Sequence, residues 1–397
     1  MRIFKKNFFW QGLVLIIFSG SLLSPYALCR SGPQTDADKL WAGESPGHKA
    51  SYAQYAEIIA GIRAPQSTLA TFENRPGWSE FAKSFDRNWD KYEKKQLAPM
   101  RDWAAKELAA PISEGASVFY PFSGPDLINP YILFPNAATY ILAALEPIGK
   151  VPDFQAMSQK DFDSFFADLQ KSLHDLLSVD YFISAHMQAA MQSKELNGVL
   201  PIFLFFLARQ RAHILEVEYW FMEPDGTIQR VPAPNKDKER LAGIVPGVRI
   251  VFESADSPGN RPQTLYYFRL NLINSKFEKN GHFASFLKSF GPFITFMKSA
   301  SYVMFDPQLS IARQFVLDQS RYILQEDSGI PFKYFDPSVW SLQFYGVYKE
   351  PISMFKYGRQ ADLAKVYATG SNIGPLPFGI GYHYKAGTAN LLLATRK

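Results

Sequence analysis

The sequence predicts an α/β fold with a mixed, mainly parallel, Rossmann-like sheet, a helical N-terminal extension and a β-rich insertion. Three observations lead to this prediction. Residues 117–146 are patterned as strand, turn, helix and strand, which is the βαβ unit of parallel sheets. Helical and strand-like segments alternate again after about residue 283. The 397 residues are 47% hydrophobic and 20% charged, a balance that excludes a disordered, collagen-like or coiled-coil chain.

The first 29 residues have the pattern of a secretory signal peptide. Three of the first six residues are basic, and an apolar stretch from Phe8 to Leu23 follows. Cleavage before Arg30 is expected, because Ala27 and Cys29 place small residues at the two positions that a signal peptidase recognises. Two alternatives stay open. In the first alternative, Cys29 becomes the acylated N-terminus of a lipoprotein. In the second, the apolar stretch, which is close to the length that spans a membrane, is an uncleaved membrane anchor.

Removal of residues 1–29 takes away three of the 42 basic residues and none of the 37 acidic ones, so the remaining chain has a net charge of +2. Phosphate binding needs a concentrated positive face, so nucleic acid is excluded as a partner. The single cysteine lies in the signal, and a mature chain without cysteine suits an oxidising compartment. We therefore expect an exported protein, periplasmic or extracellular. The alternatives are that its N-terminal segment anchors it in the membrane or that it associates with the cell envelope.

The rest of the chain divides into three parts. Residues 30–50 are rich in Gly, Pro, Ser and Asp and form a tether. Residues 51–110 are a helical N-terminal extension, and residues 111–397 are the α/β domain, with the β-rich insertion at about 216–274. The extension is marked by aromatic residues at helical spacing, which predicts one buried helix face: Trp78, Phe81, Phe85, Trp89 and Tyr92.

Further elements follow from capping and turn signals. Ser158 and Asp161 predict the start of a helix through a capping-box pattern, and Asp306 and Pro307 predict another that runs to Gln319. Two more helices are expected at 181–193 and 199–215. The expected strands occupy 216–223, 227–231, 247–254, 264–272, 293–298 and 322–325, and a closing hairpin pairs 379–384 with 390–395.

Polar residues follow the predicted parallel strands at the points where the strands end. In open α/β sheets, ligands bind beyond the carboxyl ends of the strands, and an acidic residue after the second strand commonly binds ribose hydroxyls. The predicted ligand contacts are Ser123, Gly124 and Asp126 after the first strand, Glu146 after the second, and Lys298 and Asp327 opposite them.

The order and spacing of these elements resemble the start of a class I methyltransferase or another Rossmann-like domain, and the closing hairpin resembles the antiparallel end of that group. The chain departs from the Gly-x-Gly-x-x-Gly pattern, because its first loop has Gly124 followed by Pro125. An exported protein would also lack a supply of S-adenosylmethionine. The resemblance therefore implies topology, and the cofactor is unknown.

The chain is also similar to an uncharacterised family of exported bacterial proteins. The segments that carry this resemblance are Phe119–Asp126, Lys298–Tyr302 and Asp327–Pro331. The resemblance implies export and no particular activity.

Three functions follow as hypotheses. The first is a protein that holds a small ligand in the Rossmann-like crevice. The second is a methyltransferase-like or hydrolytic enzyme at the same crevice, in which Asp126 and either Glu326 or Asp327 serve as acid and base. The third is a non-catalytic cell-envelope interaction protein whose crevice is filled by Tyr120 and Phe122. No catalytic residue is assigned, and no metal site is predicted, because the six His lack ligand spacing.

Overall fold

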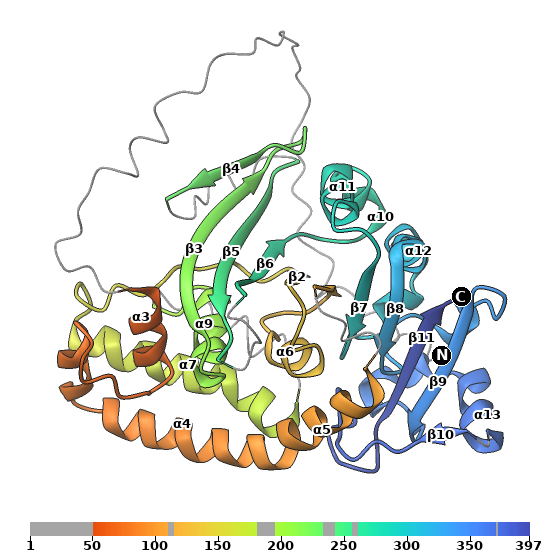
Figure 1. The fold of residues 1–397 in the computed structure, drawn as a ribbon, viewed down its shortest axis with the longest axis horizontal. Helices are drawn as coiled ribbons and strands as arrows, with labels where there is room; N and C mark the ends of the chain where they lie inside the picture. The colour runs from red at the N-terminus through yellow and green to blue at the C-terminus, as the bar shows by residue number, and fades with distance from the viewer. Residues whose placement is uncertain (1–50, 110–114, 181–194, 233–242, 256–260, 371) are drawn as a thin grey trace, which may run out of the picture. The chain divides into compact units, whose positions relative to one another are not determined.

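An 11-stranded mixed sheet extends from Ser117 to Arg396 and carries helices on both faces (Figure 1). The computed structural model describes residues 51–109, 115–180, 195–232, 243–255, 261–370 and 372–397. The predicted signal peptide, the tether and the helix at 181–193 lie outside these residues. Lys49–Lys397 form one compact unit, so the helical extension packs with the sheet as part of the same body.

The strand order is β10-β9-β11-β8-β7-β1-β2-β6-β5-β3-β4, and Figure 1 shows the sheet from the green strands β3 and β5 to the blue strands β8–β11. The central strands β8, β7, β1, β2 and β6 are mutually parallel. The strands are β1 (Ser117–Pro121), β2 (Thr139–Ala144), β3 (His213–Met222), β4 (Ile228–Val231), β5 (Val245–Glu253), β6 (Gln263–Arg269), β7 (Phe293–Met297), β8 (Ser320–Gln325), β9 (Trp340–Gly346), β10 (Ile373–Gly374) and β11 (Asn390–Arg396).

The strands β1, β2 and β7 at the centre of the sheet are almost wholly apolar because both of their faces are covered. Side chains alternate between the faces along a strand, so Val118 and Tyr120 of β1 belong to one core and Phe119 belongs to the other. The first core is covered by α3 (Tyr52–Ile59), α4 (Trp78–Tyr92), α5 (Ala98–Glu107), α6 (Ile128–Leu133), α7 (Gln159–Val179) and α9 (Leu200–Arg209). The second is covered by α10 (Asn274–Phe277), α11 (Gly281–Lys288) and α12 (Ser310–Gln319). A further helix, α13 (Ala361–Thr369), follows β9.

The aromatic spacing in residues 78–92 forms the predicted helix, α4, and its apolar side chains pack into the first core. One turn of wider π-helix, Glu93–Leu97, joins α4 to α5. The predicted start of α7 is also confirmed, because Ser158 and Asp161 form a reciprocal capping box. Among the helices of the described residues, none has the length and apolar character that crossing a bilayer requires.

The prediction of a mainly parallel sheet is wrong. The sheet is mixed, and its two longest ladders, β3 with β5 and β9 with β11, are antiparallel. The cause is that the β-rich insertion does not form a separate layer: its strand β6 pairs in parallel with β2, and the antiparallel β5 and β3 continue the same sheet from β6. Pattern alone identified the hairpins of the insertion but did not reveal the strand to which they would pair.

The closing hairpin was also predicted incorrectly. Asn390–Arg396 forms β11, but this strand inserts between β8 and β9 and is antiparallel to both. Residues 379–384 form a tight turn with a single bridge between Ile380 and His383. The expected helix at 199–215 ends earlier, at Arg209, because Arg211 takes a left-handed conformation and β3 begins at His213.

We predict that Phe166→Ala lowers the free energy of unfolding by about 3–5 kcal/mol. Phe166 is fully buried in α7, and its ring lies 5.4 Å from that of Phe81 and 4.9 Å from that of Phe162. Urea denaturation of residues 30–397 measures the change, with the exposed Lys83→Ala of α4 as the control. Equal stability of the two variants would contradict the burial of Phe166 in the core against α4 of the extension.

Candidate functional site

The carboxyl ends of β2, β1, β7 and β8 lie at one edge of the sheet, because these strands are parallel neighbours. Each strand is followed by polar residues. Phe122–Asp126 follow β1, Glu146 follows β2, Lys298–Tyr302 follow β7, and Glu326–Ser328 follow β8. We call these four segments the carboxyl-edge loops.

Lys298 is the centre of a buried ion-pair network. Its Nζ lies 2.8 Å from Oδ2 of Asp126 and 3.5 Å from Oδ2 of Asp180, and it also donates to the backbone carbonyl of Asp180. The three side chains are between 1% and 3% exposed. The ammonium group thus joins the loop after β1, the end of β7 and the C-terminus of α7.

Neutral donors surround the two carboxylates of this network. Asp126 accepts hydrogen bonds from the Tyr120 hydroxyl (3.2 Å) and from Nδ2 of Asn129 (2.9 Å). Asp180 accepts hydrogen bonds from the Tyr92 hydroxyl (2.9 Å) and the Gly381 amide (3.2 Å). Burial nevertheless raises the pKa of Asp180 to about 6, against the opposing effect of the Lys298 charge.

A second buried network is centred on Glu326 and Asp327. Glu326 accepts hydrogen bonds from the amides of Ser299 (2.9 Å) and Ser328 (3.2 Å), and from the Ser328 hydroxyl. Burial, together with the adjacent carboxylate of Asp327, raises the pKa of Glu326 to about 8. The networks meet at Gly381, whose amide binds Asp180 and where an added Cβ would lie 3.2 Å from the Glu326 side chain.

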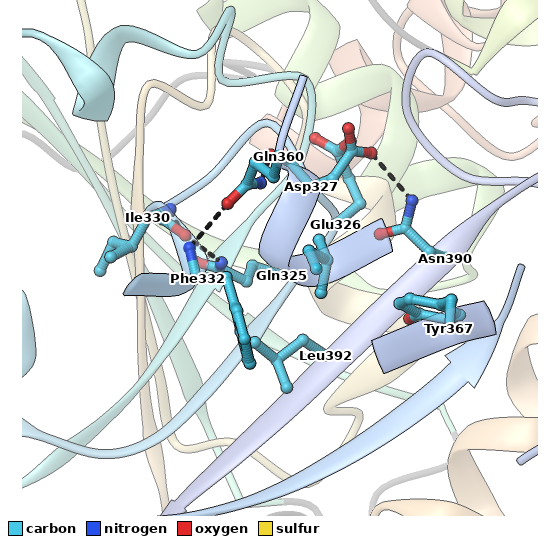
Figure 2. A pocket seen from close by; sticks show the side chains of 10 residues that line it. Gln325, Glu326, Asp327, Ile330, Phe332, Gln360, Tyr367, Asn390 and Leu392 are labelled. Carbon is cyan, nitrogen blue, oxygen red and sulfur yellow. Dashed lines mark hydrogen bonds between the residues drawn. The ribbon is translucent and has the colours of Figure 1, made fainter. Parts of the chain in front are cut away.

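Asp327 is held from two sides. It accepts hydrogen bonds from the Tyr302 hydroxyl (2.6 Å) and from Nδ2 of Asn390 (2.9 Å), and its carbonyl accepts from Nε2 of Gln360 (2.9 Å). Figure 2 shows Asp327 and Asn390 beside a cavity of about 10 Å³, which is near the smallest volume that can hold one water molecule. This cavity is too small for an organic ligand.

The carboxyl-edge loops also concentrate backbone strain. Six non-glycine residues among the described ones have a positive φ, and five of them belong to this edge or to its buried network. A left-handed conformation costs an L-residue about 1–2 kcal/mol, and such strain persists where the surrounding structure enforces it. The five are Phe122 (61°), Asp180 (62°), Ser299 (52°), Ser301 (52°) and Tyr302 (56°).

The first loop is open beside Glu146. Gly124 has a φ of 53°, and a Cβ added there would meet only Oε1 of Glu146, at 3.9 Å. Glu146 is half-buried, and burial raises the pKa of its carboxyl group. Gly124 and Glu146 therefore form the part of the predicted site that retains space around its polar groups.

The six predicted contacts form three separate groups. Asp126 and Lys298 make a buried ion pair, and Gly124 lies beside Glu146. Ser123 is buried, and its hydroxyl donates to the carbonyl of Gly124 at 2.9 Å. Asp327 receives its side-chain hydrogen bonds from Tyr302 and Asn390, so it does not lie opposite Asp126 as a free carboxylate.

Several members of these networks were not predicted from the sequence. Asp180 ends a long helix, where an aspartate is usually solvated, and Asn390 opens a strand whose position in the sheet was predicted incorrectly. Tyr92 belonged to the aromatic stripe assigned to the core, and its pattern carried no sign of a polar contact. Among the described residues, no group of three or more His, Cys, Asp or Glu side chains is placed to hold a metal ion.

No protein-family model and no curated protein matches the chain.

We predict that Lys298→Met lowers the free energy of unfolding by about 3–5 kcal/mol, because it leaves Asp126 and Asp180 buried without their cation. Adding Asp126→Asn should recover part of this loss, since one of the two buried charges is then removed as well. Urea denaturation of both single variants and the double variant measures the coupling. The exposed Lys171→Met is the control, and additive effects of the two substitutions would contradict the ion pair.

We predict that Glu326→Gln flattens the dependence of stability on pH. The folded protein holds the Glu326 proton up to about pH 8, whereas the unfolded chain releases it near 4.5. The folded state binds more protons between these values, so the wild type loses stability as pH rises through this window. The variant should gain stability over the wild type by at most about 1.4 kcal/mol per pH unit between pH 4.5 and 8.

Denaturation measured from pH 4.5 to 9 tests this expectation. The Asp180 carboxyl also lowers the free energy of unfolding as pH rises toward about 6. It is present in both proteins, so its effect cancels when the variant is compared with the wild type. The exposed Glu80→Gln of α4 serves as the control and should run parallel to the wild type. A constant difference between Glu326→Gln and the wild type would show that Glu326 titrates normally.

Proposed function

We propose that this chain is an exported α/β protein that binds a small ligand at the carboxyl-edge loops, in a Rossmann-like crevice between β2, β1 and β7. Gly124, Glu146 and Ser299 would touch the ligand. Ser123, Asp126, Lys298 and Asp327 would support the loops from behind, because each of them is buried and already engaged. This division of roles refines the set of contacts expected from the sequence.

The order of the parallel strands supports this location. Without the inserted strands β3–β5 and the two-residue edge strand β10, the parallel strands occur in the order β6-β2-β1-β7-β8-β9, with the antiparallel β11 between the last two. This corresponds to the order 3-2-1-4-5-6 of doubly wound dinucleotide-binding sheets, in which ligands bind where the order reverses. It also supports the resemblance to class I methyltransferase domains, and the reversal point lies between β1 and β7.

The observation that carries the proposal is the state of Ser299. Its backbone is left-handed, and its hydroxyl oxygen is buried with no hydrogen-bond partner in the described structure. An unsatisfied buried polar group costs about 1–3 kcal/mol, and the strain adds to that cost. Such costs are typical of ligand sites, and a ligand that hydrogen-bonds to Ser299 would recover part of them.

Binding fits the site better than hydrolysis by a pair of carboxylates. A catalytic acid and base must reach the substrate within about 2.6–3.2 Å. Asp126 and Asp327 are each 2% exposed, and their side chains are bound to Lys298 and to Tyr302 respectively. Both carboxylates therefore stabilise the loops instead of being available for proton transfer.

We predict that Ser299→Gly raises the free energy of unfolding by up to about 1 kcal/mol, because glycine adopts the left-handed conformation without strain, and lowers ligand occupancy about tenfold. Native mass spectrometry of residues 30–397, purified from the periplasm without added ligand, measures the occupancy. Arg211→Gly is the matched control: Arg211 is left-handed and exposed but lies away from the site. The Arg211→Gly variant should have a higher free energy of unfolding than the wild type and the same ligand occupancy.

Two other outcomes would count against a ligand site at the carboxyl-edge loops. A bare mass for the wild type under gentle conditions would favour an envelope interaction protein with a closed crevice. A bound mass that Ser299→Gly leaves intact would place the ligand elsewhere.

We predict that the exported chain begins at Arg30. N-terminal sequencing of protein from the periplasmic fraction measures this directly. An acylated Cys29 would establish a lipoprotein, and retention of residues 1–29 would establish an uncleaved anchor.

A further inference from the structure

A short 3₁₀ turn beside the carboxyl-edge loops carries an exposed aromatic surface. The turn spans Ser353–Gly358, and its Met354 and Tyr357 are 60% and 59% exposed. These are the two most exposed large apolar side chains in the described part of the chain. A single exposed apolar residue is ordinary, but exposed aromatic and methionine side chains next to strained loops suggest a contact surface.

Two tyrosine hydroxyls, of which one belongs to this turn, hold the strained loop after β7. The Tyr357 hydroxyl donates to the carbonyl of Ser301 at 3.2 Å, and the Tyr382 hydroxyl donates to the carbonyl of Ser299 at 3.0 Å. The hydroxyls of Ser301 and Tyr382 are also 2.9 Å apart. Both left-handed serines are therefore held through their carbonyl groups by tyrosines.

Ring contacts make the surface continuous with the second buried network. The Phe355 ring lies 4.8 Å from that of Tyr382 and 5.5 Å from that of Tyr302, whose hydroxyl binds Asp327. The Tyr302 ring packs directly on Gly358, where an added Cβ would lie only 2.3 Å from a ring carbon. The turn is thus positioned by packing and by a hydrogen bond. The Tyr357 ring meets the Tyr302 and Phe355 rings edge-on, with centroids 6.2 and 6.0 Å apart, and its remaining surface is exposed.

We infer that Tyr357 is a specificity-determining residue of the proposed site: its hydroxyl positions the Ser299–Ser301 loop, and its exposed ring stacks on a ring of the ligand. The inference rests on the proposed function. It assigns the ligand a flat face, such as a nucleobase or the apolar face of a sugar ring, joined to a polar group that reaches Ser299. Small-molecule sites commonly combine such an aromatic wall with a few placed polar groups.

Isothermal titration of residues 30–397 with adenosine and with D-glucose tests this inference, because each probe carries a ring face and hydroxyl groups. We expect the wild type to bind at least one of them. Tyr357→Leu should weaken that binding about tenfold or more through loss of the stacking partner. Tyr357→Phe keeps the ring and should weaken binding no more than about threefold.

A second readout isolates the positioning role of the hydroxyl. Tyr357→Phe should speed the hydrogen exchange of the amides in residues 299–302, although its ring still stacks on the probe. Tyr334→Leu removes another exposed tyrosine ring, 36% exposed, and should change neither binding nor exchange.

The outcomes separate the two proposals. If Ser299→Gly abolishes binding while Tyr357→Leu binds as the wild type does, the role of Tyr357 is wrong and the proposed function stands. If neither probe binds and the ligand found on the native protein is a compound without a ring, the role assigned to Tyr357 is also wrong. If the native protein carries no ligand and neither probe binds, both proposals are wrong.

Discussion

The ammonium group of Lys298 is the interaction on which the carboxyl edge of the sheet depends. It is the cation between two buried carboxylates, Asp126 and Asp180, that come from a loop and from a helix end. Burial of a charge is costly unless it is paired and hydrogen-bonded. The position of Lys298 at the end of a central strand therefore holds α7 and the first loop at the same edge.

Protonation limits the remaining negative charge. Asp180 and Glu326 both have a raised pKa, so each carboxyl keeps its proton to a higher pH than it would in water. Backbone amides and hydroxyls supply the other hydrogen bonds, and they come from loops that follow different strands. Buried hydrogen bonds of this kind rigidify a structure, so the network can hold the left-handed residues around Ser299, whose own hydroxyl has no partner in the described structure.

The two faces of the sheet contribute differently to this edge. The helices α4 and α7 cover one face, and they also deliver Tyr92 and Asp180 to the Lys298 network. The helices α10–α12 pack on the other face through apolar contacts. The N-terminal helical extension is therefore both part of the core and a source of polar contacts at the candidate site.

Local sequence patterns predict most elements and the edge at which the polar residues gather. Apolar runs, the Ser158 capping box and the turn signals act over a few residues, so α4, α7, β1, β2 and the position of Glu146 follow from local physics. The same reasoning placed Lys298 and Asp327 after strands, which brings them to the carboxyl edge.

Tertiary packing set how these elements were joined. The pairing of β6 with β2 and the insertion of β11 between β8 and β9 are long-range choices, because strand edges offer similar backbone groups to any partner. Tertiary packing likewise brought Asp180 to Lys298 across 118 residues and imposed the left-handed backbone on Ser299. Local sequence propensity predicts neither the ion pair nor the left-handed residue, because buried charge pairing and backbone strain arise only after distant segments have packed together.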